Sequence, residues 1–100
     1  MIVIGGGIAG LTAAALLAHD GVAVTLFEAH HQAGGCAGTF RRGPWIFDVG
    51  ATQVAGLEPG GSHARVFQHL GLTLPKASLL DPGCVVDLGD GSAPISLWHD

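Results

Sequence analysis

A glycine-rich turn between an apolar run and a helix-forming segment constrains this chain most strongly. Residues 5–10 read GGGIAG, which contains the pattern G-x-G-x-x-G, and they directly follow the apolar residues 1–4, MIVI. In this pattern Gly5 permits a tight turn from a strand into a helix, Gly7 lets a pyrophosphate approach the backbone, and Gly10 lets the helix pack closely on the strand. The turn therefore predicts a dinucleotide site at the N-terminus of a helix.

The segments after this turn complete a β–α–β unit. Residues 11–18 contain no helix breaker and predict a buried helix, which Gly21 is expected to end in the left-handed conformation. Residues 22–27 are mostly apolar and predict a second strand of a parallel sheet. Glu28 follows, 18 residues after Gly10, close to the spacing of about 20 residues expected for an acid that binds ribose hydroxyl groups. The sequence therefore predicts an α/β fold with a Rossmann-like unit, and Glu28 disfavours NADP.

Composition restricts the partners that this chain can have. It has 48% hydrophobic residues, only 12% charged residues and a net charge of −4. The negative charge argues against nucleic acid as a partner. The first apolar run has no basic residues before it and is interrupted by glycine, so we expect no signal peptide, no transmembrane helix and a cytoplasmic location. So apolar a chain needs more burial than 100 residues alone easily provide.

The cysteine and histidine residues do not predict a metal site. Cys36 and Cys84 lack C-x-x-C spacing, which disfavours a zinc site or a disulfide framework and predicts reduced, buried thiols. His30 and His31 are adjacent, but no third ligand follows at a suitable spacing, so we interpret them as part of a polar loop.

Three further elements are predicted beyond the glycine turn. Residues 39–41 and 45–47 predict a short hairpin, and Ser62 is a suitable N-cap for a helix over residues 63–70. Residues 84–88 and 95–98 flank the turn sequence GDGS and predict a second hairpin. Because this hairpin breaks the alternation of strand and helix, we expect residues 1–80 to belong to the dinucleotide-binding domain and residues 81–100 to begin a second, β-rich domain.

A second glycine pair lies six residues after Glu28. Gly34 and Gly35 predict another close backbone approach to the same ligand, beyond what a simple NAD site requires. This pair is the feature that separates a prediction of FAD from one of NAD.

These motifs resemble a known family. The glycine turn, Glu28, the pair Gly34-Gly35 and residues 47–50, FDVG, recur in this order in FAD-dependent amine oxidases and phytoene desaturase-type enzymes. Residues 34–40, GGCAGTF, and residues 47–61, FDVGATQVAGLEPGG, are more specific. They resemble the cyanobacterial C-3′,4′ carotenoid desaturase group, which is related to the prolycopene isomerases. The resemblance covers essentially all of the chain.

The resemblance implies FAD as the cofactor and a role for each matching residue. Glu28 would bind the adenosine ribose, the glycines of the turn would face the pyrophosphate, Gly34 and Gly35 would pass the ribityl-diphosphate region, and Gly50 and Ala51 would lie near the isoalloxazine ring. It implies a lipophilic polyene substrate and peripheral contact with a membrane, and it names no residue of this segment as a catalytic acid or base. We therefore expect the N-terminal part of a larger, two-domain flavoprotein.

Alternative interpretations remain open. A related FAD-dependent carotenoid isomerase or an amine oxidase would share the same motifs, although amine oxidases often carry Arg where this chain has Cys36. An NAD-dependent dehydrogenase would share the first turn and the ribose acid but not the second glycine pair. Both ends of the sequence look cut, which also allows a truncated, non-catalytic fragment that binds adenine dinucleotides weakly.

Overall fold

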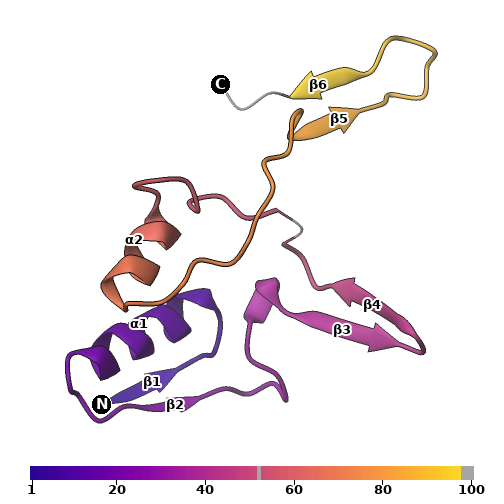
Figure 1. Ribbon diagram of the computed structural model, residues 1–100. Coiled ribbons are helices and arrows are strands. Elements are labelled where there is room, and N and C mark those ends of the chain that lie inside the picture. Colours follow the sequence, from indigo (N-terminus) through magenta and orange to yellow (C-terminus); the bar gives the residue numbers. More distant parts are fainter. Residues whose placement is uncertain (52, 98–100) are drawn as a thin grey trace.

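A β–α–β unit forms the N-terminal part of the structure, a computed structural model that describes residues 1–51 and 53–97 (Figure 1). Strand β1 (Ile2–Ile4) pairs in parallel with β2 (Thr25–Phe27), and helix α1 (Ile8–His19) connects them. The predicted α/β, Rossmann-like unit is therefore confirmed. The helix begins three residues earlier than predicted, so Gly10 lies inside its first turn.

Helix α1 ends at Gly21 in the left-handed conformation, as predicted, and β2 is shorter than the predicted strand. Gly21 has a φ of 82°, and its N–H donates to the Ala18 carbonyl at 3.0 Å. The N–H of Val22 donates back to the Leu17 carbonyl, also at 3.0 Å, which completes a Schellman motif. The predicted strand began at Val22, but the ladder with β1 begins at Thr25, opposite Ile2, and before it the Met1 amino group donates to the Ala23 carbonyl at 2.6 Å.

The predicted hairpin in the middle of the chain is confirmed. Strand β3 (Thr39–Arg42) pairs antiparallel with β4 (Trp45–Asp48), and the short 3-10 helix η1 (Gly35–Ala37) precedes them. Gly43 takes a φ of 58° in the two-residue loop, a conformation that tight hairpin turns require.

Helix α2 (Ser62–His69) starts at the residue predicted as its N-cap, one residue earlier than predicted. Gly61 occupies the cap position in an extended conformation, and Ser62 makes no capping hydrogen bond, so the prediction for Ser62 was wrong. The reason is that a preceding loop serves this end of the helix: the Ala64 N–H donates to the Gly56 carbonyl at 2.9 Å. One backbone N–H of the first helical turn therefore has an acceptor, the Gly56 carbonyl, and does not need the serine hydroxyl.

A second hairpin closes the described chain. Strands β5 (Cys84–Val86) and β6 (Ile95–Leu97) pair antiparallel, as predicted, although the predicted strand extended to Trp98, which lies outside the described residues. The Gln53 side-chain amide donates to the Gly83 carbonyl at 2.6 Å and connects this hairpin to the segment after β4. The proposed domain boundary at residue 80 stays a prediction.

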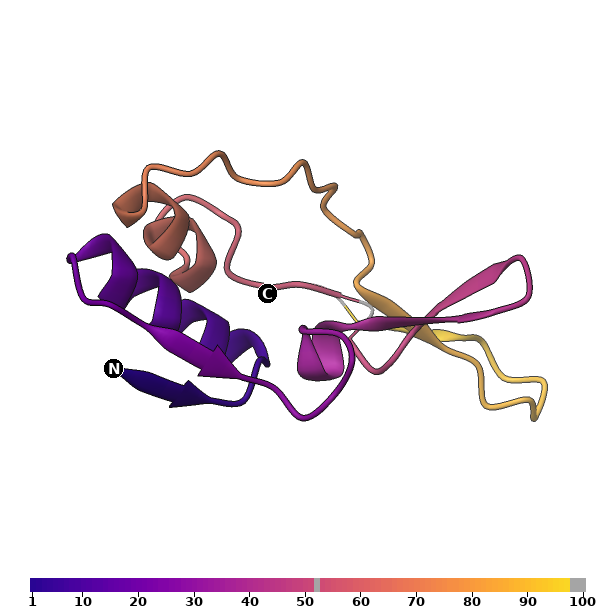
Figure 2. The ribbon, with the colours of Figure 1, turned by 90° about the horizontal axis from the view of Figure 1, so that it is seen from below.

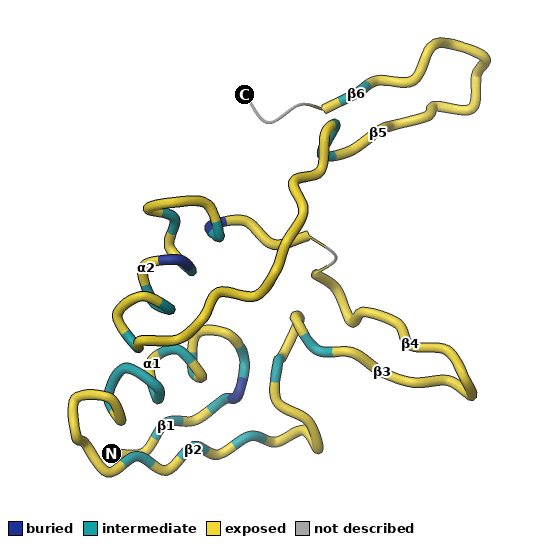
Figure 3. Tube along the Cα trace, viewed as in Figure 1, coloured by how far each residue is buried: buried dark blue, intermediate teal, exposed yellow. Residues whose placement is uncertain are grey.

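The elements are spread out rather than gathered round one core. Both hairpins extend away from the β–α–β unit (Figure 2), and most of the chain is exposed (Figure 3). The radius of gyration is 17.6 Å, against about 13 Å for a compact domain of this length. Among the described residues the one buried apolar side chain is Ala64, and Trp45 is 69% exposed. Cys36 and Cys84 are free but exposed, so the prediction of buried thiols was wrong, because no core exists to cover them.

Candidate dinucleotide-binding site

The glycine turn holds α1 tightly against the sheet. Gly5 has a φ of 100°, and its N–H donates to the carbonyl of Phe27, at the end of β2, at 2.7 Å. A Cβ added at Gly10 would lie only 1.9 Å from the Gly5 carbonyl oxygen. Only glycine fits at position 10, and this close approach brings the N-terminus of α1 to the carboxyl edge of both strands.

The N-terminus of α1 offers free N–H groups beside an open space. Gly7 is the extended N-cap residue, and its carbonyl accepts the first bond within the helix, from Leu11 at 2.9 Å. The N–H groups of the first helical turn therefore have no partner within the helix and carry a partial positive charge. A Cβ added at Gly7 would find nothing nearer than the Gly35 Cα, at 4.0 Å. An anionic group can approach the backbone at this point.

The second glycine pair lies directly against the first turn. The Gly34 N–H donates to the Gly6 carbonyl at 2.8 Å, and Gly34 forms an isolated parallel bridge with Gly7. Gly34 and Gly35 have φ values of 130° and 56°, which favour glycine. A Cβ at Gly35 would lie 3.1 Å from the Gly7 Cα. Two glycine segments far apart in sequence thus form one wall of the candidate site.

Glu28 is held at the same place by backbone donors. One carboxylate oxygen accepts a hydrogen bond from the Gly6 N–H, and the other accepts one from the His30 N–H at 2.8 Å. These bonds lower the pKa of Glu28, the bond from His30 having the larger effect, and they keep the carboxylate ionised at neutral pH. A carboxylate has about four acceptor positions, so this half-buried group can still accept bonds from ribose hydroxyls.

Sequence reasoning missed Gly6. A Cβ at this position would lie 2.9 Å from Glu28 Oε2, so a side chain here would push the carboxylate away. The signal that could have found it is the middle glycine of GGG at residues 5–7, a position that the pattern G-x-G-x-x-G leaves unspecified.

A pocket of about 280 Å³ opens beside the Glu28 carboxylate. It combines the acid, two histidines of the loop that follows it, Gly35 of the second glycine pair, and apolar residues of the first hairpin and of the segment after it. Its lining residues are Glu28, His30, His31, Gln32, Ala33, Gly35, Gly38, Thr39, Phe40 and Val49. Mixed polar and apolar walls of this kind suit a nucleoside, which has a hydroxylated sugar and a flat base.

Gly50 and Ala51 lie one step further along the same wall. The Ala51 N–H donates to the Cys36 carbonyl at 3.0 Å, and a Cβ at Gly50 would lie 3.6 Å from the same oxygen. The segment that follows β4 therefore runs beside η1, whose first residue is Gly35. The predicted contact of Gly50 and Ala51 with a flavin ring stays a prediction.

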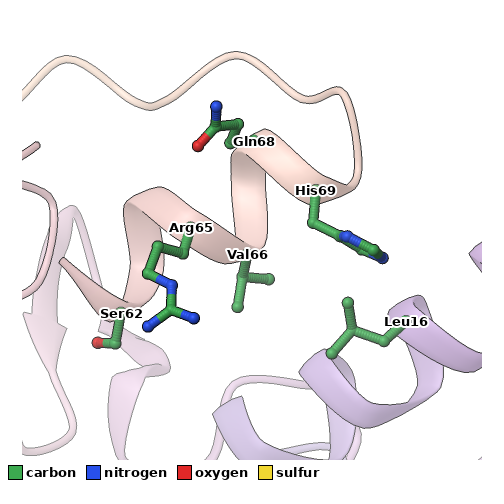
Figure 4. Close-up of a pocket in the computed structure, with 6 residues that line it drawn as sticks. All are labelled: Leu16, Ser62, Arg65, Val66, Gln68 and His69. Atoms are coloured by element: carbon green, nitrogen blue, oxygen red, sulfur yellow. The ribbon is translucent and has the colours of Figure 1, made fainter. Parts of the chain in front are cut away.

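A larger hollow between α1 and α2 lies away from the glycine turn (Figure 4). It has a volume of about 620 Å³ and is lined by Leu16 and five residues of α2, namely Ser62, Arg65, Val66, Gln68 and His69. The rings of His19 and His69 are 5.2 Å apart at the C-terminal ends of the two helices. Because it contains none of the predicted site residues, we assign the dinucleotide to the smaller pocket.

Two features are absent from the described residues, 1–51 and 53–97. No group of three His, Cys, Asp or Glu residues there is placed to hold a metal ion. No helix there has the length and apolar character needed to cross a membrane.

The chain belongs to the family of NAD(P)-binding Rossmann-like domains, whose model matches residues 3–70. It is 43% identical over 60 residues to human all-trans-retinol 13,14-reductase, a match that covers 60% of this chain and 10% of the reductase. It is 44% identical over 52 residues to 4,4′-diapophytoene desaturase of Staphylococcus aureus (strain COL), covering 52% of this chain and 10% of the desaturase. It is 41% identical over 69 residues to chloroplastic prolycopene isomerase 1 of an Oncidium hybrid cultivar, a match that covers 69% of this chain and 12% of the isomerase. The chain thus spans about a tenth of the length of these relatives.

Proposed function

We propose that this chain is the FAD-binding N-terminal part of a flavin-dependent oxidoreductase that acts on carotenoids, similar to the C-3′,4′ desaturases. The observation that carries the proposal is the convergence of Gly7, Gly35 and the ionised Glu28 in front of the N-terminus of α1. The backbone of Gly7 leaves room for a diphosphate, and the carboxylate has free acceptor positions for a ribose.

The second glycine pair supports FAD over NAD. A simple NAD site needs the first turn and the ribose acid, whereas here Gly34 and Gly35 extend the open backbone wall toward Gly50 and Ala51. When bound, FAD would supply the two-electron chemistry of a hydrogen transfer. The residues of this chain would bind and orient the adenosine-diphosphate half, and none of them is proposed as an acid or base.

The three relatives described above support a polyene substrate. Their names refer to retinol, diapophytoene and prolycopene, all of which are lipophilic polyenes. Such a substrate would bring the whole protein to the surface of a membrane, where we propose that it makes peripheral contact. Desaturation of the polyene removes two hydrogens, which the flavin would accept.

A carotenoid isomerase is the second candidate. The prolycopene isomerase match covers 69% of this chain, more than either of the other two relatives described above. An amine oxidase is less well supported, because Cys36 occupies the position after the glycine pair where that family often has Arg. Cys36 is exposed and carries no fixed charge toward a diphosphate.

The binding proposal is tested by flavin titration of the purified chain. We expect FAD to bind more tightly than FMN, because FMN lacks the adenosine half that Glu28 recognises. Glu28→Gln should remove most of this preference, whereas Glu58→Gln, the same chemical change in an exposed loop, should leave it intact. Equal affinity for FAD and FMN in the unaltered chain would contradict the proposal.

The substrate proposal is tested by product mass. The flavin-containing protein isolated from its natural source is incubated with linear carotenoids, and the products are weighed by mass spectrometry. A product lighter by two hydrogens supports desaturation, an unchanged mass with an altered absorption spectrum supports isomerisation, and turnover of an amine but not of a carotenoid would refute both.

A further inference from the structure

The hairpin of β3 and β4 presents one aromatic face to solvent. Directly opposed residues of an antiparallel pair have their side chains on the same side of the ribbon. Four exposed side chains therefore share one side, and we call them the aromatic face: Phe40 opposite Phe47, and Arg42 opposite Trp45. The two phenyl rings are stacked with centroids 5.3 Å apart, and the Arg42 guanidinium carbon lies 5.9 Å from the Phe40 ring centroid. Phe40, at the base, also lines the smaller pocket, whereas the rest of the face has no role in the proposed function.

The loop end of this hairpin is basic although the chain as a whole is acidic. Arg41 and Arg42 are two of the four Lys and Arg residues in a chain of net charge −4. The one acid of the two strands, Asp48, is opposite Thr39, at the end of the hairpin farthest from the loop. Positive charge therefore lies next to exposed aromatic rings at the free end of the hairpin.

The second hairpin has the opposite charge. The hairpin of β5 and β6 also extends away from the β–α–β unit (Figure 2), and it too exposes apolar side chains, such as Val85 and Ile95. Its connecting loop, however, contains Asp87 and Asp90 and no Lys or Arg. An anionic surface would repel this loop and attract the loop between β3 and β4. Charge thus distinguishes two hairpins that are both apolar and exposed.

We propose that the aromatic face, together with the adjacent Arg41, docks on the surface of a membrane that contains anionic lipids. Tryptophan is favoured at the level of the lipid headgroups, where its ring is in apolar surroundings and its N–H finds an acceptor. The guanidinium group of arginine binds phosphate, and attraction to an anionic membrane strengthens binding by about fivefold for each basic residue near it. The inference deepens the proposed function, because it names the surface that makes the peripheral contact, but it does not depend on the dinucleotide site.

Co-sedimentation with vesicles tests this surface in the protein isolated at its natural length. The vesicles contain either phosphatidylcholine alone or equal parts of phosphatidylcholine and phosphatidylglycerol. We expect tighter binding to the mixed vesicles, and we expect salt to weaken this preference because it screens exposed charges. Arg41→Gln/Arg42→Gln should weaken binding to the mixed vesicles by about 25-fold and leave binding to phosphatidylcholine nearly unchanged.

Two further variants separate the hairpin from the charge of the whole chain. Arg65→Gln/Lys76→Gln removes the other two Lys and Arg charges, both outside the hairpin, and should retain the preference for mixed vesicles. Trp45→Ser should weaken binding to both kinds of vesicle, because the indole ring contributes apolar area rather than charge. Circular dichroism checks that each variant is folded.

The outcomes separate the membrane from other occupants of the aromatic face. Equal losses in the two double variants would show that net charge alone drives binding. No loss in Arg41→Gln/Arg42→Gln would show that another surface binds the vesicles, or that another part of the protein covers the hairpin. A dimer that forms without vesicles and that Trp45→Ser dissociates would assign the face to a second copy of the chain. Each of these results would overturn the inference.

The flavin titration described above is read independently of the vesicle measurements. If FAD binds as expected and the vesicle measurements fail, this inference is wrong while the dinucleotide site stands. If the vesicle measurements succeed and FAD binds no better than FMN, the dinucleotide site is wrong while the membrane surface stands.

Discussion

Gly10→Ala is the sharpest test of the packing between α1 and the glycine turn. The added Cβ would lie 1.9 Å from the Gly5 carbonyl oxygen and 3.0 Å from its carbon. Real Cβ atoms essentially never come closer than 3.0 Å to another atom, so the helix or the turn must move by about 1 Å. Because both obstructing atoms are backbone, no side-chain rotation can relieve the overlap.

The magnitude follows from two opposing effects. Alanine is favoured over glycine inside a helix by about 1 kcal/mol. Overpacking costs about 1–3 kcal/mol, and a backbone obstacle places Gly10→Ala at the upper end of that range or above it. We expect a net loss of about 2 kcal/mol in the free energy of unfolding. With a urea dependence of about 1 kcal/mol per molar, the midpoint should fall by about 2 M.

The assay is a urea titration followed by far-UV circular dichroism, with Gly7→Ala as the matched control. Gly7 has a φ of −75° and no atom within 4 Å of an added Cβ except the Gly35 Cα at 4.0 Å. Its stability should change by less than about 1 kcal/mol, whereas its FAD affinity should fall by about tenfold or more. An unchanged midpoint for Gly10→Ala would refute the packing argument, and unchanged FAD affinity for Gly7→Ala would refute the role of Gly7.

Three further predictions concern pH, turn geometry and solubility. Hydrogen bonds from His30 and Gly6 lower the pKa of Glu28 in the folded chain. The ionised carboxylate therefore contributes fully to stability above the ordinary pKa of 4.5, and this contribution is lost as the pH falls through the lower pKa of the folded chain. The difference in urea midpoint between Glu28→Gln and the unaltered chain should therefore vanish in acid. Gly21→Ala should cost about 1 kcal/mol of unfolding free energy in the same titration, because its φ of 82° is unfavourable for alanine although its surroundings are open; Gly21→Asn should cost less. Trp45→Ser should reduce light scattering by concentrated solutions without lowering the urea midpoint, because Trp45 is 69% exposed.

Local rules predicted those elements whose cause is itself local. Gly21 ends α1 because a left-handed residue is needed there, and the loop at Gly43 joins two strands of a hairpin, so both could be placed from the sequence. Glu28 was found through its spacing from Gly10, since a β–α–β unit of ordinary length brings the ends of its two strands together.

The features that escaped prediction depend on contacts between distant segments. Ser62 looked like an N-cap because its side chain suits that role, but the Gly56 carbonyl, six residues earlier, already binds the helix terminus. The second strand was predicted too long because apolar character alone does not reveal that the ladder with β1 begins at Thr25, opposite Ile2. In the candidate site, the need for glycine at position 6 arises from the Glu28 carboxylate, which lies 22 residues further along the chain.

The bridge between Gly7 and Gly34 has a consequence for how this site can change during evolution. The wall formed by the first turn and the second glycine pair is main chain, so substitutions in the loop at residues 29–33 alter side chains that line the pocket while this wall stays intact. Insertions and deletions are different, because a shift of one residue at the bridge would place a residue with a Cβ at the position of Gly34, where a Cβ would lie 3.0 Å from the Gly38 Cα. The spacing between the two glycine segments therefore specifies this site, and the length of the loop that joins them is constrained more strongly than its amino-acid composition.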